Sequence, residues 1–226
     1  GNVGDAAVAR LLAGEAPLSL EGSVEVHGTI NAMGAVSIEG LGVVLTGEIH
    51  AGTDEAHQAL FEEAVNTDGI EYAASASVED GRIVIRAAED VSISGVADAS
   101  AATGSGDGGE IVVRAGQDVY LEDGAQLAAA GADDGGSGGT IDIWGDRDAS
   151  VAAGVAFDAS AGATGDGGFI EVSAVRSVSL DGLNADLGAG AGGEAGEFYI
   201  DPAEVTLAAA DTAYYTNGGD VNIVAS

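Results

Sequence analysis

The chain has 226 residues and a formal net charge of −32, because 38 Asp and Glu residues are opposed by 6 basic residues, all of them Arg. Such an acidic surface repels nucleic acid and anionic lipid, so we expect no nucleic-acid partner. There is no Cys, which excludes disulfides, and there is no apolar run of about 18 residues, which leaves no candidate for a transmembrane helix.

The amino-terminal part changes from an irregular segment to short strands. Residues 1–17 are expected to lead into the first turn, although the spacing of Val8, Leu11 and Leu12 also fits a short helix. Over residues 18–51, apolar and polar residues alternate, which predicts strands with one buried face. The apolar positions are Leu18, Leu20, Val24, Val26, Ile30, Val36, Ile38, Val43, Leu45 and Ile49. With glycines at the corners, they predict short turns of a solenoid.

The alternation breaks between residues 52 and 81. Thr53 or Asp54 can cap a short helix, whose apolar face would consist of Ala56, Leu60, Phe61 and Val65. We expect a short helical insertion that lies across the outside of the solenoid and covers one flank. A binding role for this helix is the alternative.

Residues 82–200 repeat one pattern four times. The copies open at Ile83, Ile111, Ile141 and Ile170, with spacings of 28, 30 and 29 residues, and a Gly-Gly pair precedes the last three. Each copy holds three short alternating segments and a Gly-rich loop, and a fixed period of this length predicts a repeat architecture. Disorder is the alternative for the loops, but the apolar columns stay in register. We therefore predict that the four Ile side chains form one buried column.

Pro202 interrupts the pattern, because proline has no backbone N–H for a strand ladder. Strand character resumes at Val205, Leu207, Val221 and Ile223, so residues 201–226 are expected to continue the solenoid. Together these elements predict an all-β protein, a parallel β-helix of about eight coils with a narrow core of small residues. We expect this single domain to be one segment of a longer protein, because strand character continues close to its last residue.

Three stretches can be compared with a known family. One is Gly-Arg-Ile-Val-Ile at 81–85 with Val-Ser-Ile-Ser-Gly at 91–95, and another is Gly-Asp-Gly-Gly-Phe-Ile-Glu-Val-Ser at 165–173. The most specific is 196–207, which contains Phe198-Tyr199-Ile200-Asp201-Pro202 and precedes Asn-Gly-Gly-Asp-Val at 217–221. These stretches resemble the shaft repeats of filamentous-haemagglutinin-like exoproteins, the adhesins of two-partner secretion systems. The resemblance covers residues 18–226.

The resemblance implies a right-handed β-helix that is exported through a dedicated outer-membrane pore partner. It implies a secreted protein at the cell surface that acts as an adhesin or as part of a biofilm matrix. Host or matrix glycans, neighbouring cells and lateral self-association are the expected partners. The family's amino-terminal secretion signature is not found, so the chain would be shaft that follows it.

One outward column contains most of the groups suited to carbohydrate. Directly after the second buried position, the copies carry Arg86, Arg114, Trp144 and Ser173. An Arg stacked on an indole gains about 0.5 to 1 kcal/mol when exposed. Arg86, Arg114 and Trp144 are therefore candidate glycan-binding residues, since a ring stacks on a sugar and Arg donates to hydroxyls. A solvated face without a ligand is the simpler interpretation.

A second column is acidic. It contains Asp90, Asp118 and Asp148, with Ser177 in the last copy. Stacked carboxylates repel one another and need partners. The simplest partners are backbone N–H groups at the corner before each second strand, and the alternative is calcium bridging between coils. Calcium is the one cofactor that the sequence offers.

Other chemistry has weaker support. The loops around Asp107 and Asp166 resemble calcium-binding nonapeptides but lack their tandem spacing, and a flexible glycine turn with an Asp for solubility explains them. An enzyme would need a base beside clustered carboxylates, and the best group is Asp142, Asp146, Arg147 and Asp148. With so many acidic residues such a cluster arises by chance, and we expect no enzyme. The histidines, His27, His50 and His57, have no spacing that predicts a metal site or a triad.

The expected function is therefore that of a structural shaft of a secreted adhesin or biofilm filament, which adheres through repetitive multivalent contacts. The alternative is a carbohydrate-binding or carbohydrate-degrading β-helix. A third hypothesis is a shaft that carries a contact-dependent toxin in a following domain.

Overall fold

The structure is a computed structural model that describes residues 18–19, 24–32, 36–40, 42–51, 81–101, 104–207, 214–217 and 219–224. Every regular element in these residues is a β-strand. The helix expected in the insertion falls on residues 52–80, which lie outside the described residues, as does the lead-in of residues 1–17.

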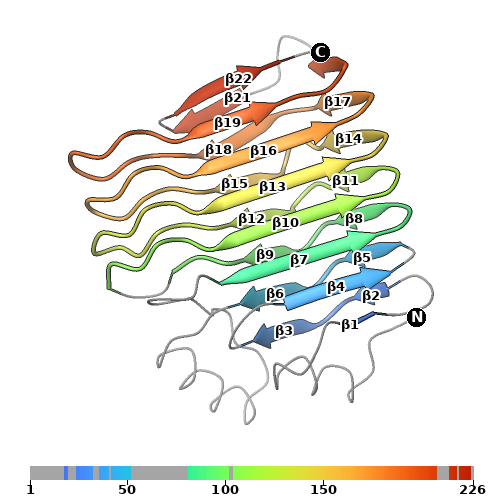
Figure 1. The fold of residues 1–226 in the computed structure, drawn as a ribbon, viewed down its shortest axis with the longest axis horizontal. Coiled ribbons are helices and arrows are strands. Elements are labelled where there is room, and N and C mark those ends of the chain that lie inside the picture. Colours follow the sequence, from blue (N-terminus) through green and yellow to red (C-terminus); the bar gives the residue numbers. More distant parts are fainter. Residues whose placement is uncertain are drawn as a thin grey trace.

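The strands form three parallel sheets that run the length of the molecule (Figure 1). The first sheet has eight strands: β1 (Leu18–Ser19), β4 (Val36–Gly40), β7 (Arg82–Ala87), β10 (Glu110–Ala115), β13 (Thr140–Gly145), β16 (Phe169–Ala174), β19 (Glu197–Ile200) and β22 (Asp220–Ile223). The second has seven: β2 (Val24–Val26), β5 (Val43–Leu45), β8 (Val91–Ile93), β11 (Val119–Leu121), β14 (Asp148–Val151), β17 (Ser177–Leu180) and β20 (Glu204–Leu207). The third also has seven: β3 (Thr29–Ala32), β6 (Glu48–Ala51), β9 (Val96–Asp98), β12 (Gln126–Ala128), β15 (Ala156–Asp158), β18 (Leu183–Asp186) and β21 (Tyr214–Asn217).

Each turn of the chain places one strand in each sheet and then returns to the first sheet one level further along. This is a parallel β-solenoid, as the repeat predicts. About four turns, from Gly81 to Gly196, are described almost without interruption. The sequence predicts about eight coils, and each coil contributes one strand to each sheet. The three sheets of the described residues contain eight, seven and seven strands.

The core is a set of columns inside the solenoid. Ile83 pairs with Ile111, Ile111 with Ile141 and Ile141 with Ile170, and all four side chains are fully buried. The predicted Ile column is therefore confirmed, and Phe198 extends it by one turn. Burying one such side chain stabilises the fold by about 1.5–3 kcal/mol. No turn could bury its own apolar face without its neighbours.

The Gly-Gly pairs hold each loop against the next turn. The N–H of Gly138 donates to the Asp166 carbonyl of the following turn, and the N–H of Gly139 donates to the Ala129 carbonyl of its own turn. A Cβ atom at Gly139 would lie 2.1 Å from the Gly109 carbonyl oxygen. The glycines are therefore needed because backbones approach too closely for a side chain.

Candidate functional site

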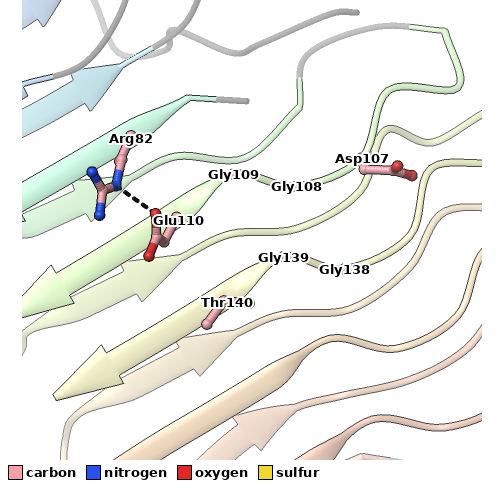
Figure 2. Close-up of a pocket in the computed structure, with 8 residues that line it drawn as sticks. All are labelled: Arg82, Asp107, Gly108, Gly109, Glu110, Gly138, Gly139 and Thr140. Carbon is pink, nitrogen blue, oxygen red and sulfur yellow. Dashed lines mark hydrogen bonds and ion pairs between the residues drawn. The ribbon is translucent and has the colours of Figure 1, made fainter. Parts of the chain in front are cut away.

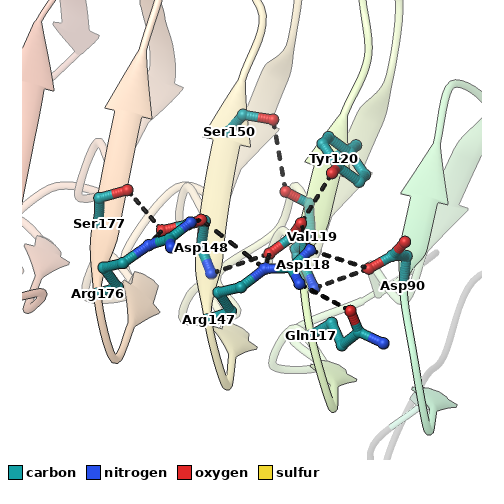
Figure 3. Close-up of polar contacts among 10 residues, drawn as sticks. All are labelled: Asp90, Gln117, Asp118, Val119, Tyr120, Arg147, Asp148, Ser150, Arg176 and Ser177. Carbon is teal, nitrogen blue, oxygen red and sulfur yellow. Dashed lines mark hydrogen bonds and ion pairs between the residues drawn. The ribbon is translucent and has the colours of Figure 1, made fainter.

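The acidic column lies at the corner before the second sheet (Figure 3). The backbone N–H of Asp118 donates to Asp90 Oδ1 at 3.0 Å, and that of Asp148 donates to Asp118 Oδ1 at 3.2 Å. Asp90 and Asp118 thus each accept the N–H of the equivalent residue one turn later, whereas Asp148 accepts the hydroxyl of Ser177 at 2.6 Å. Backbone capping is the simpler of the two roles that the sequence offered.

Two arginines pair with two carboxylates of this column, Asp118 and Asp148. Arg147 Nε donates to Asp118 Oδ1 at 2.6 Å, and a second nitrogen of the same guanidinium donates to Oδ2. Arg176 makes the same forked contact with Asp148 (Figure 3), with Nε at 2.8 Å from Oδ1. Forked Arg–carboxylate pairs fix geometry as well as charge. We call Asp90, Asp118, Asp148, Arg147 and Arg176 the Asp–Arg corner.

The electrostatics of the corner follow from these contacts. Hydrogen bonding from Arg176 lowers the pKa of Asp148 from 3.8 to about 2, and hydrogen bonding from Arg147 lowers the pKa of Asp118. Tyr120 donates its hydroxyl to Asp118 Oδ2 at 2.8 Å, and this bond raises the pKa of Tyr120. The carboxylates of Asp118 and Asp148 are therefore held in their ionised form.

Calcium would have to compete for oxygens that already have partners. Calcium takes six to eight oxygen ligands, whereas Asp118 is 5% exposed and both of its oxygens accept from Arg147. Within the described ranges no group of three His, Asp or Glu side chains could hold a metal ion. As it stands, the corner joins successive turns.

The two corner arginines were missed as partners of the acidic column. The signal was present, because Arg147 and Arg176 each directly precede the column position in their own copy. Arg147 was instead grouped with the carboxylates of a hypothetical enzyme cluster. In the structure each carboxylate of that group has a partner outside it, since Asp142 pairs with Arg114, Asp146 accepts from Trp144, and Asp148 pairs with Arg176. Within the group, Arg147 Nε lies 3.9 Å from the Asp148 carboxylate.

The candidate glycan-binding column lies on the outer face of the first sheet. Arg86 pairs in register with Arg114, and Arg114 with Trp144. The Arg114 guanidinium is directed to Asp142, donating to its carboxylate and, at 3.1 Å, to its carbonyl. The Trp144 indole N–H donates to Asp146 Oδ1 at 2.8 Å, which fixes the ring. Trp144 is thus preorganised, whereas Arg114 is occupied by an ion pair.

A shallow pocket lies beside this face, at the start of β10 and β13 (Figure 2). Its volume is about 450 Å³, and it is lined by Arg82, Asp107, Gly108, Gly109, Glu110, Gly138, Gly139 and Thr140. Arg82 and Glu110 form an ion pair across neighbouring turns. The walls are therefore polar side chains and glycine backbone.

A further titratable pair lies on the third sheet. His50, which is 4% exposed, lies between Glu48 and Asp98, with 3.7 Å from its Nδ1 to the Asp98 carboxylate. Burial lowers its pKa, but the two carboxylates outweigh this and the net pKa is raised. The sequence concealed this pair because the insertion separates its members, and His57 lies outside the described residues.

Comparisons with family models, with curated proteins and with solved structures found no match for this chain. No helix among the described residues is long and apolar enough to cross a membrane.

Proposed function

We propose that the chain is a segment of the right-handed shaft of a secreted cell-surface adhesin or biofilm filament. Its role is to be long, stiff and repetitive, and to adhere through many weak contacts along its length. The observation that supports this most directly is that the strands of all three sheets follow one another in chain order, one turn after the next. Stiffness follows because each turn is held to the next by backbone ladders in all three sheets.

Links outside the sheets add to this stiffness. Among the residues that the structure describes, seven side-chain oxygens accept the backbone N–H of a residue one turn later: those of Asp90, Ser100, Asp107, Asp118, Ser137, Asp166 and Ser173. These hydrogen bonds connect the corners and loops of successive turns, in addition to the bonds between strands. The resemblance of residues 196–207 to haemagglutinin-like shafts supports the placement at the cell surface.

The proposal is tested on the cells that make the protein. Antibodies raised against the purified chain should label intact cells, and loss of the outer-membrane pore partner should abolish the labelling. Deleting the region that encodes the chain should lower attachment to a glycan-coated surface. Labelling that requires permeabilised cells would overturn the proposed location, and unchanged attachment would overturn the adhesive role.

A further inference from the structure

Among the described residues, partly exposed aromatic side chains are concentrated on one face of the solenoid. Phe157 and Phe198 pack edge to face in the core at 5.6 Å. Among the side chains that the structure describes, the outward aromatics are Tyr120, Trp144, Phe169 and Tyr199. Trp144, Phe169 and Tyr199 lie on the outer face of β13, β16 and β19 in the first sheet. Because aromatic residues make up only 4% of the sequence, three of them on one face is a local enrichment.

The rings on this face are held in place. Phe169 and Tyr199 lie on neighbouring turns with centroids 6.4 Å apart and a tilt of 31°. Trp144 is oriented by its bond to Asp146. Glu171 lies between the aromatic groups, next to Tyr199 in register, and accepts a hydrogen bond from Ser173 at 2.8 Å. All three rings are partly exposed, so a ligand meets fixed aromatic surfaces beside a carboxylate.

The polar pocket continues this face. Thr140, which lines the pocket, pairs in register with Phe169 on the next turn. Arg82, Glu110, Thr140 and Phe169 therefore form one row along the solenoid axis. The row passes from charged groups and a hydroxyl to an aromatic platform.

A sugar ring has one apolar C–H face and a rim of hydroxyls, so it needs an aromatic surface flanked by acceptors and donors. The net charge of −32 repels acidic sugars. We propose that the outer face of β13, β16 and β19 binds a saccharide chain of neutral or amino sugars, lying along the solenoid axis between the pocket and the Phe169–Tyr199 pair. This inference rests on the proposed adhesive function and names its ligand class.

The sequence provides its own reporter, because Trp144 is the one Trp of the chain. Purified chain would be titrated with neutral, amino and acidic hexasaccharides while Trp fluorescence and, independently, binding heat are recorded. We expect saturable changes with neutral or amino hexasaccharides and none with acidic ones. The double variant Phe169→Ala, Tyr199→Ala should weaken binding about tenfold or more, because it removes the platform but keeps the reporter. Thr140→Val should weaken it less.

Tyr120→Leu is the matched control, because it removes an exposed aromatic from the second sheet and should leave affinity unchanged. Circular dichroism and thermal unfolding establish that each variant folds. The proposal is overturned if no hexasaccharide binds, if Tyr120→Leu weakens binding as much as the double variant, or if spermidine, an amine without a sugar, binds equally well. None of these outcomes bears on surface display, which the antibody labelling tests separately.

Discussion

At the scale of single residues, the molecule depends on side chains that serve the neighbouring turn. Asp107 and Asp166 show this most clearly, because each accepts the backbone N–H of the next turn's loop at 2.8 Å. Interpreting them from sequence as flexible, solubilising loop residues was incomplete. Their oxygens replace the strand ladder where the loop has left the sheet, so the Gly-rich segments are stacked in order.

The corner pair Arg176–Asp148 gives a prediction at this scale. The pKa of Asp148 is depressed to about 2, so the pair stabilises the fold above the unfolded pKa of 3.8, and this stability is lost as pH falls toward 2. Arg176→Gln should return the pKa of Asp148 toward 3.8. Carboxyl-carbon NMR titration measures this directly.

Arg82→Gln is the matched control, because it breaks an ion pair on the first sheet and should leave the Asp148 pKa unchanged. The melting temperature of the wild type should fall more steeply between pH 4 and 2 than that of Arg176→Gln. Equal slopes would contradict the assigned partner.

At the scale of elements, the glycine pairs are the most sensitive positions. Gly139→Ala should lower the melting temperature markedly, because its Cβ would lie 2.1 Å from a carbonyl oxygen and the two turns would have to separate. Gly28→Ala is the control, since nothing lies within 4 Å of its Cβ. A small rise is expected there, because Ala restricts the unfolded chain. Similar destabilisation by both changes would show that close approach is not the cause.

The strands and the core columns could be predicted because each position recurs at a regular period and therefore stacks on itself. Contacts within one column, such as Asp90 with Asp118, could be foreseen for the same reason. Contacts between neighbouring columns could not be predicted from the sequence. The side-chain rotamer decides, for example, whether Arg114 is directed toward Trp144 or toward Asp142. The diagonal pair Phe169–Tyr199 was missed for this reason, and the pair His50–Asp98 because residues 52–81 interrupt the period.

At the scale of the whole molecule, the repeat predicts that turns can be removed in phase. Deleting residues 110–168 joins Gly109 to Phe169 and restores a Gly-Gly-Phe-Ile junction. Arg176 would then face Asp90 as it now faces Asp148. The shortened chain should fold and be shorter by two strand spacings, about 10 Å, as small-angle scattering would show.

Deleting residues 110–154 is the control, because it joins Gly109 to Val155 in the middle of a copy. That variant should misfold or aggregate, since its strands meet the wrong partners. If the in-phase deletion also failed to fold, the turns would not be interchangeable modules.

The net charge of −32 gives a second prediction at this scale. Self-repulsion destabilises a compact acidic protein, so sodium chloride should raise the melting temperature by screening. Calcium and magnesium at matched ionic strength should act alike, because the oxygens of Asp118 and Asp148 are held by arginines. A calcium-specific rise that Asp118→Asn abolishes would instead establish a calcium ladder at Asp90, Asp118 and Asp148.

The bonds from side chains to the next turn also have a consequence for how the chain folds. A bare parallel strand edge offers N–H and C=O groups at either end of a solenoid. The seven additional bonds all have the same direction along the solenoid, because in each one the acceptor lies on the earlier turn and the donor on the later turn. Each turn therefore presents side-chain acceptors to the segment that follows it and backbone N–H donors to the segment before it, as Ser137 shows by accepting from Asp166 and donating to Asp107. A chain that emerges with its amino-terminal end first has the acceptors of each turn in place before the donors of the next turn appear.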